Sequence, residues 1–182
     1  MALKIRFRAL LALSGDPIEN GELIIDDGKI VEISTQFVNG KNGDTLDLSD
    51  CLLMPGFVNA HCHLSLTALE KKFSPFPSFE DWIRALISLN SVLDDESRVR
   101  GIRAGAKEMK RSSVTALGDY VAEPGLLQVI GGLGFRSVLF LETIGFHSEK
   151  ARVLCEKVEE VLKSQSSSPL CRLGLAPHAP YS

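Results

Sequence analysis

Apolar and polar positions along the chain predict two regions with different secondary structure. The first fifty residues are typical of β-strands, because the run KIRFRALLAL (4–13) alternates and then turns apolar. The segment GELIIDDGKIVEIS (21–34) has two short apolar runs on either side of Asp26, Asp27 and Gly28. An Asp-Gly pair in this position is a strong signal for a tight turn, so a β-hairpin is expected. The polar stretch 39–44 predicts a further loop.

From about residue 57 onward, apolar stretches with strand-like and helix-like spacing alternate. We expect strands at about 57–63, 114–121, 136–144 and 171–178, and helices at about 78–93, 96–110, 126–133 and 148–164. The strand at 57–63 is expected to be buried. Strands separated by helices pair in parallel through right-handed crossovers. Four such units amount to half of an eight-stranded barrel, although a complete four-stranded doubly wound α/β sheet also fits the pattern.

Composition and charge exclude several classes of partner. The chain has 182 residues, a net charge of −3 and no basic stripe that could neutralise nucleic-acid phosphates. No apolar run approaches the length of a membrane span. The four cysteines show neither CxxC spacing nor a secretory context. We therefore expect a cytoplasmic protein that binds neither nucleic acid nor membrane.

The main chemical feature is the string PGFVNAHCHL, in which His61 and His63 lie two residues apart at the end of a strand. A strand directs residues i and i+2 to the same face, so both imidazoles can point at one spot while Cys62 faces away. Two imidazoles on one face suit a divalent cation such as zinc. The alternative is a pair of hydrogen-bonded histidines that only end the strand.

Three further polar residues stand at or near the ends of predicted strands. His178 lies between prolines in GLAPHAPYS and is either a structural hydrogen-bonding group or part of a site with His61 and His63. Glu142 interrupts the apolar run VLFLETIG, and a buried carboxylate needs a partner or a function. It could orient a substrate or pair with a neighbouring cation. Asp119 in ALGDY is a similar but weaker candidate.

Taken in order, the strings PGFVNAHCHLSLTAL, DWIRALISL and GLAPHAPYS resemble the amidohydrolase superfamily, in its branch of aminohydrolases and chlorohydrolases. That branch includes adenosylhomocysteine, guanine and aminodeoxyfutalosine deaminases. The resemblance implies an α/β fold: a small β-sandwich segment at 1–52, and at 53–182 the first four βα units of a metal-dependent (β/α)8 TIM barrel. This barrel would be incomplete, and an incomplete gene sequence is the favoured explanation.

The same resemblance implies roles for particular residues. His61 and His63 would be metal ligands from the first barrel strand, and His178 would touch the substrate from the fourth. We also assign Glu142 to substrate binding. The family takes its other ligands and its proton-shuttling carboxylates from later strands, so no catalytic residue is expected within these 182 residues. Ser65 stands where close relatives often carry glutamate, which weakens any inference about the substrate.

The expected function is metal-dependent hydrolysis of a carbon–nitrogen bond other than a peptide bond. The substrate would be a purine-like or nucleoside-like small molecule, deaminated by a metal-activated water. One divalent metal is expected, because the fourth strand offers His178 and no lysine to bridge two metals. Zinc is favoured over iron. Alone, the chain should bind metal weakly and hydrolyse nothing. The rival hypothesis is a non-catalytic module acting in oligomerisation, and a homo-oligomer stays open.

Overall fold

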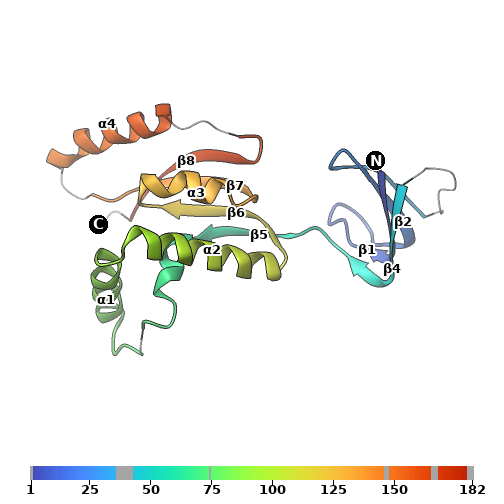
Figure 1. Ribbon diagram of the computed structural model, residues 1–182, viewed down its shortest axis with the longest axis horizontal. Helices are drawn as coiled ribbons and strands as arrows, with labels where there is room; N and C mark the ends of the chain where they lie inside the picture. The colour runs from blue at the N-terminus through green and yellow to red at the C-terminus, as the bar shows by residue number, and fades with distance from the viewer. Residues whose placement is uncertain (1, 36–42, 74, 146–147, 165–167, 180–182) are drawn as a thin grey trace. The chain divides into compact units, whose positions relative to one another are not determined.

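The computed structural model describes residues 2–35, 43–73, 75–145, 148–164 and 168–179 (Figure 1). The chain divides into two compact units, Met1–Pro55 and Gly56–Ser182. Each unit contains one four-stranded sheet and is described by itself. Among the described residues, no helix is both long enough and apolar enough to cross a membrane.

The first unit is a sheet with the strand order β3-β2-β1-β4. Its strands are β1 (Ala2–Leu10), β2 (Ile18–Asp26), β3 (Lys29–Ser34) and β4 (Gly43–Leu53). β1 is antiparallel to β2 and parallel to β4. Phe7, Leu10 and Leu23 form its buried apolar cluster. A single sheet does not establish a sandwich, so the β-sandwich stays a prediction.

The hairpin predicted around the Asp-Gly pair is confirmed. β2 and β3 are antiparallel, and Asp26 lies opposite Lys29. Asp27 has a φ of 48° and Gly28 a φ of 69°. Positive φ at both central residues is the requirement of a type I′ turn, whose twist matches that of the strands. Of the predicted 39–44 loop, residues 43 and 44 begin β4, and the remainder lies outside the described residues.

The second unit is a sheet of four parallel strands in the order β5-β6-β7-β8. The strands are β5 (Phe57–Cys62), β6 (Val114–Val121), β7 (Arg136–Thr143) and β8 (Cys171–Pro177). The α-helices are α1 (Phe79–Ser91), α2 (Asp95–Arg111), α3 (Leu127–Gly131) and α4 (Ser148–Ser164). Two 3₁₀ helices, η1 (Leu64–Leu69) and η2 (Pro124–Leu126), complete the unit. The predicted alternation of helices with parallel strands is confirmed.

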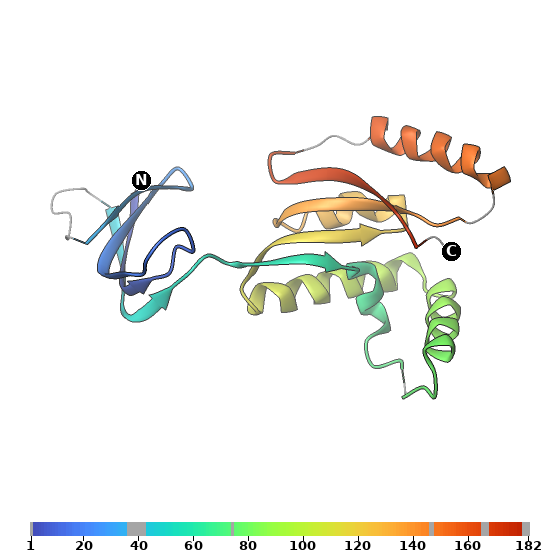
Figure 2. The same ribbon diagram turned by 180° about the vertical axis from the view of Figure 1, so that it is seen from behind.

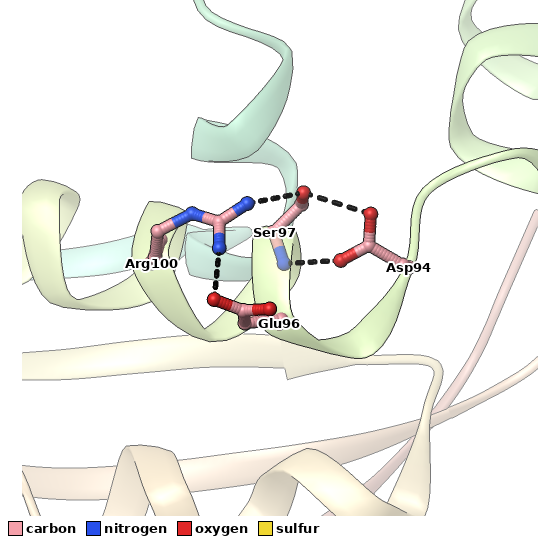
Figure 3. A network of polar contacts seen from close by, with 4 residues as sticks. All are labelled: Asp94, Glu96, Ser97 and Arg100. Atoms are coloured by element: carbon pink, nitrogen blue, oxygen red, sulfur yellow. Dashed lines mark hydrogen bonds and ion pairs between the residues drawn. The ribbon is translucent and has the colours of Figure 1, made fainter.

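Side-chain caps fix where the first two α-helices begin. The Ser78 hydroxyl accepts a hydrogen bond from the Asp81 amide at 3.1 Å, at the start of α1 and at the point where the predicted 78–93 helix begins. At α2 the Asp94 carboxylate accepts from the Ser97 amide at 2.7 Å and from the Ser97 hydroxyl at 3.0 Å (Figure 3). Arg100 donates to that hydroxyl, at 2.8 Å, and pairs with Glu96. The contacts to the Asp81 and Ser97 amides satisfy backbone groups that have no partner within the helix.

The core of the second unit lies between the sheet and its helices. α2 and α3 lie on one face of the sheet, behind it in Figure 2. Ile102 and Ala106 of α2, Ile130 of α3 and Leu117 and Leu139 of the sheet belong to one buried cluster. This cluster fixes the strand ends that carry the candidate site.

The prediction that the 57–63 strand is buried is wrong. Phe57 is 54% exposed and Val58 is 69% exposed. The physical reason is that β5 lies at an edge of the sheet, and no described helix covers the face opposite α2 and α3 (Figure 2). Closure of the sheet into a barrel therefore stays a prediction.

Candidate metal-binding site

His61 and His63 lie at the carboxyl end of β5, with their imidazole ring centroids 5.2 Å apart and their planes at 65°. His61 is exposed, and His63 is half-buried at the point where the chain enters η1. In parallel α/β sheets, ligands bind at the carboxyl ends of the strands. The pair is thus placed where a metal or substrate can reach both rings.

Asp119 of β6 anchors the backbone around His63. Its Oδ1 atom accepts a hydrogen bond from the Leu64 amide at 2.9 Å and one from the Cys62 thiol at 3.6 Å. These donors are the two chain neighbours of His63. Asp119 is fully buried, and burial raises the pKa of its carboxyl group, against the opposing effect of the Leu64 hydrogen bond. The residue that the sequence marked as the weakest candidate therefore holds the histidine strand end in place.

Cys62 lies between the two histidines but packs against the apolar cluster beneath the sheet. Its thiol also lies within hydrogen-bonding distance of the Gly118 carbonyl, at 3.4 Å. Burial, and then the charge of Asp119, raise the pKa of Cys62 to about 12. Because metals bind the thiolate, a thiol held protonated in this way is a poor ligand at neutral pH.

The raised pKa makes Cys62 far less reactive than the exposed Cys155 on α4. At pH 8, a thiol with a pKa near 12 is ionised to about one part in ten thousand, and only the thiolate attacks an alkylating reagent. We expect native protein treated with iodoacetamide to be modified at Cys155 at least about 100-fold faster than at Cys62. Mass spectrometry of the peptides measures both rates. Denaturation in urea should make the two rates similar, and similar rates in the native protein would contradict the placement of Cys62.

Glu142 and His178 are brought together at the ends of β7 and β8. His178 Nε2 lies 3.9 Å from Glu142 Oε1, and the His178 amide donates to the Thr143 carbonyl at 2.9 Å. The Glu142 side chain is only 10% exposed. The sequence left open whether Glu142 pairs with a neighbouring cation, and His178 is such a neighbour when its ring is protonated. Among the described residues, no three His, Cys, Asp or Glu side chains converge in a way that could hold a metal ion, so neither residue is grouped with the histidine pair. Their assignment to the substrate stays a prediction.

Tyr120 of β6 is a site residue that the sequence patterns did not reveal. Its ring stacks on His61, with centroids 4.2 Å apart and planes at 25°, and lies 5.7 Å from the ring of His63. Its position directly after Asp119 could have revealed it. Successive side chains of a strand point to opposite faces, so when Asp119 points into the core, Tyr120 points to the face that carries His61.

The donors in this site fit part of a zinc shell. Zinc takes imidazole nitrogen readily, and a catalytic zinc keeps three protein ligands with one open position. His61 and His63 supply two such nitrogens from one strand end. The pair therefore matches zinc in donor chemistry and would fill two of the three ligand positions of such a site.

Comparison with known proteins gives relatives of one kind, although no protein-family model matches the chain. A 5-methylthioadenosine/S-adenosylhomocysteine deaminase 2 of Archaeoglobus fulgidus is 29% identical over 171 residues, which cover 89% of this chain and 40% of the relative. An adenosine deaminase structure from Xanthomonas campestris with bound zinc matches with a TM-score of 0.80 and 24% identity, over 99% of this chain and 43% of that one. The Helicobacter pylori aminofutalosine deaminase matches with a TM-score of 0.81 and 22% identity, over 98% and 44%.

These matches confirm the resemblance to the amidohydrolase superfamily that the three sequence strings indicated. The curated relative named above and the two structures are all deaminases. At these identities the structural matches establish the fold alone, a mixed α/β architecture. The chain spans about two fifths of the length of the curated relatives it matches.

Proposed function

We propose that this chain is part of a metal-dependent hydrolase that removes an amino group from a purine-like or nucleoside-like small molecule. The observation that carries the proposal is the histidine pair: two imidazoles from one strand end, with centroids 5.2 Å apart, at the carboxyl edge of a parallel sheet. The relatives support this reading, because deaminases of adenosine-type nucleosides recur among them.

In this proposal, His61 and His63 hold one divalent metal, for which zinc is favoured because a matching structure contains it. A bound zinc lowers the pKa of a coordinated water to near neutrality and so supplies a nucleophile. Asp119 keeps the two ligands at a fixed separation through its hydrogen bonds to Leu64 and Cys62. This rigidity matters because a site that is loose by about 1 Å loses much of its activity.

Glu142 and His178 are proposed to contact the substrate. They lie on adjacent strands at the same edge of the sheet as the histidine pair, because β5 to β8 are parallel. His178 Nε2 lies 3.9 Å from the Glu142 carboxylate, so a protonated His178 ring would form an ion pair that orients it. A carboxylate that is 10% exposed and so oriented can accept a hydrogen bond from an amino or hydroxyl group of a substrate.

An ammonia-release assay tests this function. The protein is translated from the complete reading frame that contains these residues, loaded with zinc, and supplied with 5′-deoxyadenosine, 5-methylthioadenosine, S-adenosylhomocysteine and guanine. We expect ammonia from at least one adenosine-type nucleoside, and a His63→Ala variant that is at least about 100-fold slower, since general catalytic groups alone account for about 10²–10⁴ in rate.

Two outcomes would contradict the proposal. One is the absence of ammonia release from every compound in this set by zinc-loaded protein. The other is an undiminished rate in the His63→Ala variant. The 182-residue chain alone is expected to release no ammonia, because its described residues supply two of the three ligands that a catalytic zinc needs. A turnover rate in that chain equal to that of the complete protein would refute this expectation.

A further inference from the structure

Three aromatic rings form a continuous row across the strands of the second unit. Phe140 of β7 stacks on Tyr120 of β6, with centroids 4.9 Å apart and planes at 26°. Tyr120 in turn stacks on His61 of β5 at 4.2 Å and 25°. Each ring therefore comes from a different strand, and the row ends at the candidate ligand His61.

The far end of the row is held by the backbone of β8. A Cβ atom added to Gly174 would lie 2.7 Å from Cδ1 of Phe140 and 2.9 Å from its Cε1. Such distances mean that the Phe140 ring lies directly against the Gly174 backbone. A ring in this position cannot move away from Tyr120 toward β8, so the row is fixed at one end.

His61 needs such support because it is exposed and lies on an edge strand. An exposed side chain that is free to change rotamer loses conformational entropy when it binds a metal. A stacked neighbour that selects one rotamer beforehand reduces this loss. The π face of a phenol also attracts an imidazole made electron-poor by a bound cation.

We propose that Tyr120 is a positioning residue, whose ring holds the imidazole of His61 in the orientation in which His61 and His63 can share one metal ion. The inference rests on the proposed metal site but makes a separate claim about the metal-free protein. It is the ring of Tyr120 that acts, so phenylalanine can replace it and leucine cannot.

The first readout is the NMR spectrum of the metal-free protein. Carbon-bound protons of an imidazole stacked on an aromatic ring are shifted upfield by the ring current. We expect this shift for His61 in the wild type and in Tyr120→Phe, and its loss in Tyr120→Leu. Phe76→Leu is the matched control, because it removes one ring of the separate Phe73–Phe76 pair. A wild-type His61 with unshifted signals overturns the proposal, whether or not the leucine variant folds.

The second readout is zinc affinity, measured by competition with a chromophoric chelator. Removing a residue that orients a ligand costs about 10–100-fold in metal affinity. We expect Tyr120→Leu to lose about 10-fold or more, and Tyr120→Phe and Phe76→Leu to stay within about 3-fold of the wild type. Unchanged affinity in Tyr120→Leu overturns the proposal. A wild type that binds no zinc but shows the shifted His61 signals contradicts the proposed function while supporting the positioning role.

Discussion

Replacing His63 with alanine is expected to lower zinc affinity by at least about 100-fold, because loss of even an outer residue that orients a ligand costs about 10–100-fold. His63 is one of two imidazoles at the carboxyl end of β5. Without it, the described residues leave His61 as a single donor, and one imidazole holds zinc weakly. Competition with a chromophoric chelator measures the change in the dissociation constant.

The matched control is His178→Ala, which removes the same side chain from the end of β8. His178 pairs with Glu142 and is assigned to the substrate, so its removal should leave zinc affinity within about 3-fold while slowing turnover. Equal losses of zinc affinity in the two variants would place His178 among the ligands. Unchanged affinity in His63→Ala would remove the histidine pair from the metal site.

Replacing Gly101 with alanine is expected to destabilise the second unit by about 1–2 kcal/mol after the gain in helix propensity is taken into account. A Cβ atom at Gly101 of α2 would lie 2.4 Å from the Ala68 amide nitrogen and 2.7 Å from its Cα. Both atoms are backbone, so no side-chain rotation relieves the overlap, and overpacking of this kind costs about 1–3 kcal/mol or more. Alanine offsets about 1 kcal/mol through its higher helix propensity. The displaced segment is η1, which directly follows His63.

Urea denaturation followed by far-ultraviolet circular dichroism measures this loss. Gly125→Ala is the control, because a Cβ atom there would have no neighbour within 4 Å. We expect Gly125→Ala to change the free energy of unfolding by less than about 0.5 kcal/mol, as is usual for exposed positions. A Gly101→Ala variant as stable as the control would show that α2 and η1 do not pack closely in solution.

Local features of the fold followed from the sequence because local chemistry determines them. The Asp27-Gly28 turn needs positive φ at both positions, and this requirement is visible in the residue types. The cap at Ser78 is likewise a matter of one hydroxyl and one nearby amide. The parallel pairing of β1 with β4 depends instead on contacts between residues far apart in the chain, which no local pattern encodes.

The positions of the two histidines in the candidate site were predictable, and the residues that support them were not. His61 and His63 were visible because an i, i+2 pair at a strand end has one simple geometric consequence. The anchoring role of Asp119 needs the register that places it beside Cys62 on the next strand, and a single sequence does not specify that register. Tyr120 was missed for a similar reason, since its stacking on His61 arises between strands separated by a 3₁₀ helix and two α-helices.

X-ray absorption at the zinc edge of the zinc-loaded protein tests the central claim most directly, because nitrogen and sulfur ligands scatter at different distances. The account predicts imidazole nitrogen at about 2.0–2.1 Å, with the outer-ring scattering of two histidines that falls on substitution of either His61 or His63. Scattering from sulfur at about 2.3 Å would contradict it. That result would mean that zinc recruits a cysteine such as Cys62, and the histidine pair would not be the metal site.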